Sequence, residues 1–192
     1  IIDTPGFANF LSDAKSALRV AEGALVCVDA VAGVEVQTEK LWAEAAELNL
    51  PRLVVVSRLE RERASLERTL ESLRRDCARE IIPIQLPIGE ERAFTGVVDL
   101  VRMKALTFAA DGSGKMAEAD VPADMVERAG AAREQLIEMV AEADEQLMET
   151  FFSEGTLTQD QLAGGLRAAT MAGKVFPLVC TSGMHVIGIQ PL

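Results

Sequence analysis

Three short, continuously apolar runs restrict the fold of this chain more than any other feature. They are Ala24–Val28, Leu53–Val56 and Val175–Cys180. A strand whose residues are all apolar is typical of a parallel sheet that is covered by helices on both faces. Segments with apolar residues at helical spacing alternate with these runs. The alternation predicts an α/β fold with right-handed crossovers and a doubly wound, mainly parallel sheet.

Three helices are expected around the first two runs. Apolar residues recur at helical spacing over residues 10–22, 36–48 and 65–77. Pro51 stops the second of these segments, and Ser65 has the residue type of an N-cap for the third.

The pattern changes after about Glu80. Residues 81–88 are extended and twice interrupted by proline, whereas residues 94–100 and 103–108 resemble short strands of an antiparallel meander. This composition differs from that of the buried runs and predicts a second structural unit inside the first.

Helices are expected to complete that unit. A long acidic helix is predicted at 125–144, a short one around 147–152, and a third that is opened by the capping box of Thr158 and Gln161. The prediction is therefore an α/β sheet domain over residues 1–78, an inserted α+β subdomain over 79–174, and a return to the first domain over 175–192.

The charge of the chain limits its partners. It has 30 acidic and 19 basic residues among 192, a net charge of −11. Proteins that grip a phosphate backbone present a basic stripe, so no direct nucleic-acid contact is expected here. An acidic surface suits solubility or a basic protein partner. No apolar run approaches the roughly 18–20 residues that span a bilayer, so no membrane contact and a cytoplasmic location are expected.

The cysteines and the histidine predict no metal site. Cys27, Cys77 and Cys180 are odd in number and widely spaced, which favours reduced, mostly buried thiols over a disulfide framework. The single histidine, His185, has no carboxylate or cysteine at metal-ligand spacing and is expected to face solvent in a loop.

The first residues carry a pattern with nucleotide chemistry. Ile1 and Ile2 resemble the end of a buried strand that runs into Asp3, Thr4, Pro5 and Gly6, the Asp-x-x-Gly element of P-loop GTPases. A carboxylate there can hold Mg²⁺ through its water shell, and a glycine amide can approach the γ-phosphate of GTP. Asp3–Gly6 are therefore candidate GTP-binding residues, with Asp3 also the candidate metal ligand. The phosphate loop and first switch do not precede this element, so the fold is interpreted as a partial P-loop GTPase domain.

Two further candidate elements follow the other apolar runs. Ligands lie at the carboxyl ends of parallel strands, where GTPases place Asn-Lys-x-Asp to read guanine and Ser-Ala to close over the base. The second run is followed by Ser57-Arg58-Leu59-Glu60, and the third by Thr181-Ser182-Gly183. The additional candidate GTP-binding residues are Ser57, Arg58, Glu60, Ser182 and Gly183.

Each element also has a plain structural interpretation. Ser57 can cap a strand end, and Arg58 with Glu60 can open a charged surface run that continues to Arg63. Residues 181–183 can form an ordinary turn. The order of the three elements, each after a buried run, favours the nucleotide interpretation.

The sequence resembles the GTPase domain of bacterial translation elongation factor G over essentially its whole length. The resemblance is carried by Asp3–Gly6, Asp29–Val34, Val54–Glu62, Ile84–Gly89, Phe94–Leu100, Asp120–Met125 and Cys180–Leu192. It implies a ribosome-dependent GTPase that promotes translocation, with GTP or GDP and Mg²⁺ bound by the full-length protein. It also implies that the insert contacts the ribosomal stalk protein.

The chain departs from the usual residues of this family at the site itself. The family usually has a histidine after the Asp-x-x-Gly glycine to position the attacking water, and this chain has Phe7, which cannot hydrogen-bond water. Asn9 stands where the family usually has an aspartate. Ser57, Arg58 and Glu60 replace the asparagine, lysine and aspartate of the Asn-Lys-x-Asp element that binds guanine. The catalytic position is thus occupied by a residue that is not expected to be competent. The alternative function is a ribosome-docking paralogue or regulator with weak or absent GTP hydrolysis.

Overall fold

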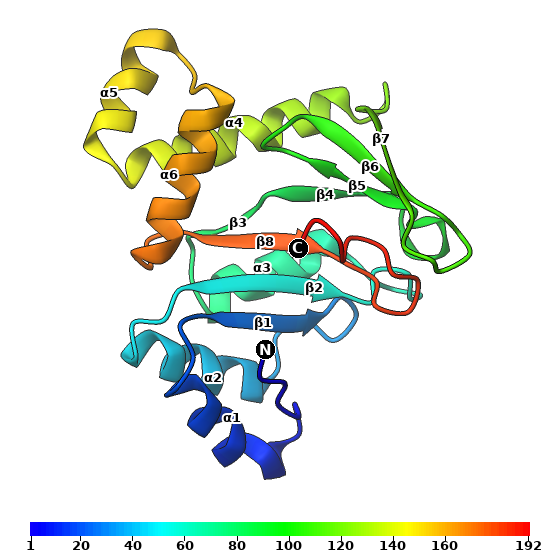
Figure 1. Ribbon diagram of the computed structural model, residues 1–192, viewed down its shortest axis with the longest axis vertical. Helices are drawn as coiled ribbons and strands as arrows, with labels where there is room; N and C mark the ends of the chain where they lie inside the picture. The colour runs from blue at the N-terminus through cyan, green and yellow to red at the C-terminus, as the bar shows by residue number, and fades with distance from the viewer.

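Two four-stranded sheets organise the protein, whose computed structural model describes residues 1–192 (Figure 1). The first, called the parallel sheet below, has the order β1-β2-β8-β3, and every neighbouring pair is parallel. Its strands are β1 (Ala24–Asp29), β2 (Arg52–Ser57), β3 (Ile81–Pro83) and β8 (Phe176–Cys180). The predicted α/β fold with a mainly parallel sheet is confirmed, and the three apolar runs supply three of its strands.

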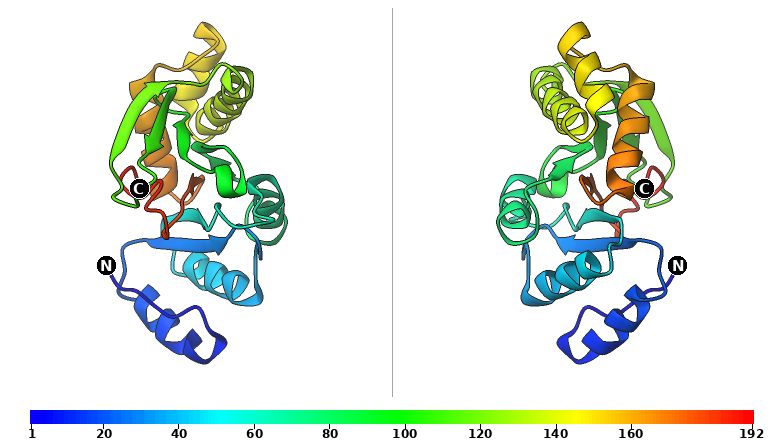
Figure 2. Two further views of the ribbon diagram at one scale, coloured as in Figure 1. Left: turned by 90° about the vertical axis from the view of Figure 1, so that its right-hand side faces the viewer. Right: turned by 90° about the vertical axis from the view of Figure 1, so that its left-hand side faces the viewer.

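Three helices accompany the parallel sheet, as the sequence predicts. They are α1 (Leu11–Leu18), which follows a 3-10 turn at Ala8–Phe10, α2 (Val36–Glu47) and α3 (Leu66–Asp76). The hydroxyl oxygen of Ser65 accepts a hydrogen bond from the backbone N–H of Arg68 at 3.2 Å and so caps α3. Helix α2 contacts β1 and α3 contacts β3, whereas α1 lies beyond α2 at the outer end of the molecule (Figure 2).

A buried arginine ties α2 to the parallel sheet. Arg52, at the start of β2, is 7% exposed. Its guanidinium carbon lies 4.6 Å from the ring centre of Trp42 on α2 and 4.3 Å from that of Phe176 on β8. The two aromatic faces stabilise the charge, although burial lowers the pKa of Arg52. The amino end of the sheet is therefore closed by packed side chains.

Two expectations about β1 are wrong. Its residues alternate in burial instead of being covered on both faces, and Leu25 is 57% exposed. Cys27 lies on the same face and is exposed, while Cys180 is buried and Cys77 half-buried. The reason is the position of β1 at the edge of the sheet, where it has one neighbouring strand. The apolar run identifies a strand but does not indicate its place in the sheet.

The expected end of a strand at Ile1 and Ile2 is also wrong. Both residues are exposed and neither belongs to a strand. No strand of the structure pairs with them, so their backbone groups form no ladder and their side chains stay uncovered. The following loop still leads into the predicted helix.

The second sheet is antiparallel throughout, with its strands in chain order. They are β4 (Gln85–Ile88), β5 (Gly96–Asp99), β6 (Lys104–Phe108) and β7 (Met116–Asp120), and a 3-10 turn at Glu91–Ala93 links the first two. The predicted meander is confirmed, but the sequence prediction misses β7. All five residues of β7 are exposed and most are alanine or acidic, so neither burial pattern nor β propensity marks this strand.

Three further helices are grouped at the end of the molecule opposite α1 (Figure 2). They are α4 (Val126–Glu142), α5 (Glu145–Glu154) and α6 (Gln159–Met171). The predicted capping box is present: Gln161 N–H donates to the Thr158 hydroxyl at 3.3 Å, and Thr158 N–H donates to the Gln161 side chain at 2.9 Å. The division of the chain at residues 79 and 175 stays a prediction. Strand β3 lies within the 79–174 range, but it pairs with β8 and so belongs to the parallel sheet.

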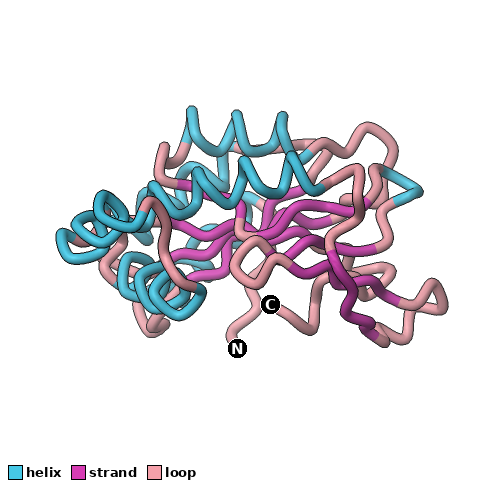
Figure 3. The backbone as a smooth tube through the Cα atoms, turned by 90° about the horizontal axis from the view of Figure 1, so that it is seen from above, coloured by secondary structure: helices cyan, strands magenta, loops and turns pink.

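The two sheets share one core. The Gln85 side-chain oxygen is buried and accepts the backbone N–H of Cys180 at 3.1 Å, and Ile84 N–H donates to the carbonyl of Leu178 at 2.9 Å. A connected cluster of 32 buried apolar residues includes members of both sheets. Seen from above, the strands run through the middle, with helices along one side and at one end (Figure 3). No helix combines the length and apolarity needed to cross a membrane.

Candidate functional site

The loops after β1, β2 and β8 meet at the edge of the parallel sheet toward which these arrows point in Figure 1. The N–H of Ala30, just after β1, donates to the carbonyl of Ser57 at 2.9 Å. The N–H of Thr181, just after β8, donates to the carbonyl of Val56 at 2.8 Å, and the carbonyl of Thr181 in turn accepts from Leu59 at 3.5 Å. Ligands of α/β proteins bind at this edge. Backbone hydrogen bonds therefore hold the segments after β1, β2 and β8 side by side at this edge.

An open cavity of about 930 Å³ lies at this edge beside β1. Its walls come from the loop before α1, the end of β1, the start of α2 and the end of β2. Four of the predicted site residues line it: Gly6, Phe7, Ser57 and Arg58. Its volume is within the roughly 300–1,000 Å³ typical of small-molecule sites. Two sequence elements that are far apart in the chain therefore share one cavity.

The other residues of the first element lie outside the cavity wall. Asp3, Thr4 and Pro5 do not line it. Asp3 is exposed. The pKa of the nearby Cys27 thiol is raised, mainly by the partial burial of the thiol itself and further by the negative charge of Asp3. No group of three His, Cys, Asp or Glu side chains could hold a metal ion. A metal at Asp3 would depend on water and ligand oxygens, which is the usual coordination of Mg²⁺ beside a nucleotide.

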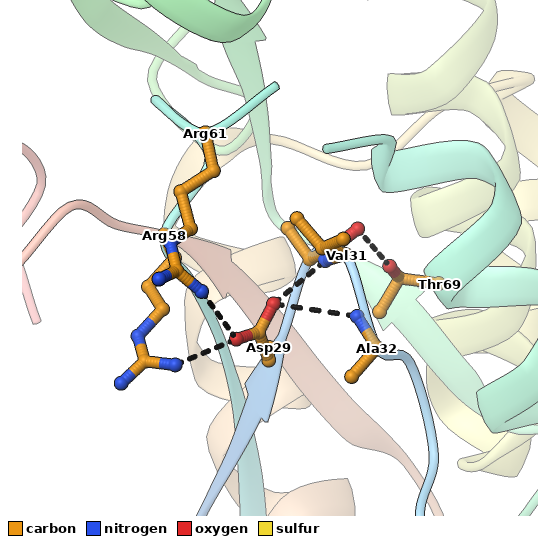
Figure 4. Close-up of polar contacts among 7 residues, drawn as sticks. Asp29, Val31, Ala32, Arg58, Arg61 and Thr69 are labelled. Carbon is orange, nitrogen blue, oxygen red and sulfur yellow. Dashed lines mark hydrogen bonds and ion pairs between the residues drawn. The ribbon is translucent and has the colours of Figure 1, made fainter. Parts of the chain in front are cut away.

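Asp29, the last residue of β1, connects two of these loops (Figure 4). Its Oδ1 accepts hydrogen bonds from the backbone N–H groups of Val31 and Ala32, at 2.8 and 3.3 Å. Its Oδ2 accepts from Nη1 of Arg58 at 2.8 Å and lies 3.6 Å from Nη1 of Arg61. Partial burial alone would raise the pKa of Asp29, but the hydrogen bonds and the Arg58 charge lower it below its ordinary value of 3.8.

The sequence prediction misses Asp29 as a site residue. The signal that points to it is a carboxylate directly after a run predicted to be a parallel strand. Both Asp29 and Arg58 line the cavity, so their ion pair belongs to its wall.

Arg58 has an unusual backbone conformation. Its φ is +63°, in the left-handed region that favours glycine, and its side chain is 57% exposed. Non-glycine residues in this region cost free energy unless neighbouring contacts hold them. The hydrogen bond to Asp29 is such a contact.

Glu60 does not line the cavity, although it follows Arg58 by two residues. Its Oε2 is inaccessible to solvent and has no hydrogen-bond partner. A buried oxygen without a donor costs free energy, so this atom is a ready acceptor for an N–H group.

The third predicted element forms a closed turn. Ser182 is fully buried, and its backbone exchanges hydrogen bonds with that of Ile187 at 2.9 and 3.0 Å. Its hydroxyl accepts from the N–H of His185, which is exposed in the loop as predicted. Neither Ser182 nor Gly183 lines the cavity. The structure brings this element beside the second one, through Thr181, without adding it to the cavity wall.

Comparison with known proteins decides the family. The family model described as the elongation factor Tu GTP binding domain matches residues 1–192. The chain belongs to this family.

Known members and structures agree with this assignment. The chain is 36% identical to Elongation factor G from Thermotoga maritima over 192 residues, which are all of this chain and 28% of that protein. A crystal structure of a protein from Thermus thermophilus matches with a TM-score of 0.87 and 36% identity, covering 98% of this chain and 28% of that one. The resemblance to elongation factor G is confirmed. The chain spans about 28% of the length of these relatives.

Proposed function

We propose that the protein containing this domain binds GTP and acts in translation as an elongation-factor-G-like GTPase that promotes translocation on the ribosome. The observation that carries the proposal is the joint presence of Gly6, Phe7, Ser57 and Arg58 in one cavity at the carboxyl edge of the parallel sheet. Family membership supports a guanine nucleotide as the ligand. Such a factor would act in the cytoplasm.

Residues of the cavity wall and of the two loops beside it suit different parts of the nucleotide. The Arg58 guanidinium can stack on the base. The Glu60 carboxylate, whose Oε2 is buried without a donor, would accept the ring and exocyclic N–H groups of guanine once the loop turns it toward the base. The amide of Gly6 suits the γ-phosphate. Ser57 and the turn at Ser182 and Gly183 would complete the base pocket.

Asp3 would hold Mg²⁺ through water, with Thr4 and Pro5 keeping its loop in place. A single exposed carboxylate fits an ion that takes most of its ligands from water and phosphate. When bound, the ion neutralises charge on the phosphates.

Nucleotide binding is tested by titrating the full-length natural protein with fluorescent GDP, with ATP as competitor. Glu60→Gln is expected to weaken GDP binding about tenfold, because it replaces an acceptor by an amide that can present N–H groups to guanine. The matched control is Glu62→Gln, in the same loop, whose side chain is 72% exposed and pairs with Arg92. An affinity for ATP equal to that for GDP would contradict the assignment of guanine.

A second function is favoured by one residue. Phe7 lines the cavity, is 77% exposed, and has no group that can orient water. The protein would then dock on the ribosome as a paralogue or regulator with weak or absent GTP hydrolysis. GTP turnover by the full-length protein, with and without ribosomes, separates the two functions. Restoration of turnover by Phe7→His supports the regulator, whereas brisk turnover by the unaltered protein defeats it.

The insert is proposed to contact the ribosomal stalk protein, with the segment itself making no direct grip on nucleic acid and no contact with membrane. The support is a solvent-facing helix, α5, which has no buried residue and leaves Phe152 78% exposed beside acidic side chains. The neighbouring helix α4 adds the exposed Glu138 and Glu142 to Glu149 of α5. Charge reversal of these three residues should reduce stalk-stimulated turnover, while Glu47→Lys on α2, which is also exposed, should not. Equal turnover in all variants would remove this proposal.

A further inference from the structure

The two carboxylate oxygens of Asp29 make different contacts, and a substitution can remove one set of contacts while keeping the other. Its Oδ1 closes the turn after β1 through the N–H groups of Val31 and Ala32, whereas its Oδ2 faces Arg58 and Arg61. An asparagine would keep the first set of contacts, because its amide oxygen accepts the same hydrogen bonds. It would lose the negative charge that attracts the arginines. The Asp29→Asn substitution can therefore remove the ion pairs with Arg58 and Arg61 while the hydrogen bonds that close the turn remain.

Arg58 needs such a partner. Its left-handed backbone is unfavourable for a residue with a side chain, and its guanidinium makes one hydrogen bond, to Asp29. More than half of the side chain is exposed. Without Asp29, the guanidinium would sample several rotamers in front of the cavity.

The parallel register brings the two residues together. Asp29 lies opposite Ser57 in the ladder between β1 and β2, so the residue after Ser57 starts beside the carboxylate. Asp29 would repel a phosphate by itself, but its charge is offset by Arg58 and Arg61. The carboxylate therefore acts on the loop rather than on a ligand.

We propose that Asp29 is a positioning residue of the nucleotide site, which orients the Arg58 guanidinium at the cavity and keeps residues 57–60 in the conformation that receives the base. The inference rests on the proposed function, because it concerns the base-reading loop of that site. Asp29 acts through Arg58 and does not touch the nucleotide. A side chain that is already immobilised loses less freedom when a base stacks on it, so the nucleotide dissociates more slowly.

The test measures binding and release of fluorescent GDP by the full-length natural protein. Asp29→Asn is expected to weaken affinity roughly fivefold, mainly through faster dissociation. The matched control is Asp99→Asn. Asp99 ends β5 and accepts the N–H groups of Val101 and Arg102, at 2.9 and 3.0 Å, but its carboxylate pairs with no arginine side chain. Its replacement should leave GDP affinity unchanged.

A second pair of variants distinguishes positioning from a structural role. If Asp29 acts through Arg58, adding Asp29→Asn to Arg58→Gln changes GDP affinity no further. In an Arg58→Lys background, where a positive charge remains, the effect of Asp29→Asn should persist in part. A fivefold loss that remains undiminished in the Arg58→Gln background would overturn the inference.

The proposed function and this inference fail in different ways. If the unaltered protein binds neither GDP nor GTP, the proposed function fails. If it binds GDP and Asp29→Asn binds as tightly as Asp99→Asn, only the role of Asp29 is refuted. Circular dichroism of each variant checks that the fold is intact.

Discussion

Asp29 in the parallel sheet and Asp99 in the antiparallel sheet have the same local geometry and different surroundings. Each ends a strand, and the Oδ1 of each accepts two backbone N–H groups from the next turn. Only Asp29 has arginines at its second oxygen. Arg102, close to Asp99 in sequence, instead pairs with Glu118 on β7.

Strand direction accounts for this difference. Neighbouring parallel strands end at the same edge, so Asp29 lies opposite Ser57 and beside the loop that carries Arg58. Asp99 lies opposite Gln85 and Lys104, which are the first residues of their antiparallel strands. The same aspartate turn therefore contributes to a candidate site in one sheet and only closes a turn in the other.

The largest expected effect comes from a glycine in each region. A Cβ at Gly188 would lie 2.2 Å from the carbonyl oxygen of Cys180, and φ there is +72°. A Cβ at Gly96 in β5 would lie 2.3 Å from the carbonyl oxygen of Leu106. Substitution of either by alanine should cost about 3 kcal/mol of stability. Only Gly188→Ala should also weaken GDP binding, because its Cβ would press on Cys180 and Thr181, and the carbonyl of Thr181 accepts from Leu59 in the loop after β2.

Amide hydrogen exchange and GDP titration measure these effects separately. Protection should fall first around β8 in Gly188→Ala and around β5 and β6 in Gly96→Ala. Gly130→Ala is the control, since this helical position has open space for a Cβ and alanine favours helix by about 1 kcal/mol. An equal loss of GDP affinity in both destabilised variants would break the contrast between the two regions.

A smaller effect is expected from pH. The pKa of Asp29 is lower in the folded protein than its ordinary value of 3.8. Its stabilising contribution is therefore present above that value and is lost as pH falls through the lowered pKa. Unfolding experiments should show the unaltered protein to be more stable than Asp29→Asn by up to about 1 kcal/mol near neutral pH. The difference should shrink in acid, and a difference that grows on acidification would contradict the ion pair.

The smallest effect is expected at Arg61. Its Nη1 is 3.6 Å from Asp29 Oδ2, and its side chain is 55% exposed. Exposed ion pairs of this kind contribute little, so Arg61→Gln should change GDP affinity less than about twofold. Comparing the GDP affinity of Arg61→Gln with that of Arg58→Gln tests whether the 2.8 Å contact between Arg58 and Asp29 is sufficient to position the loop. A larger effect from Arg61 would show that the positioning task belongs to Arg61 and not to Arg58.

Local features could be predicted from the sequence because they depend on residues close together in the chain. The helices follow from apolar spacing, and the Ser65 cap and the Thr158–Gln161 box follow from hydrogen bonds that span three residues. The α/β class follows from the alternation of those segments. By contrast, β7 carries no such pattern, because its exposed residues are not selected by a core.

The candidate site could be predicted only in part. The residue types that follow the buried strands identify Ser57 and Arg58, and the structure places both at a cavity with Gly6 and Phe7. The exposure of Cys27 depends on the edge position of β1, and the contacts of the Asp29 carboxylate depend on Arg58, which is 29 residues away. Neither can be predicted from residues close together in the chain. Ser182 matches the family element in sequence, yet it is buried in its own turn.

Residue order and chemistry predicted an α/β domain and its family, and they named candidate nucleotide-binding residues after its strands. The tertiary structure decided which of those side chains meet. Asp29 and Arg58 are 29 residues apart and are joined by the crossover through α2, which returns the chain to a parallel strand at the same edge. A charge pair of this kind depends on strand direction and register, and these are set by the packing of the whole sheet.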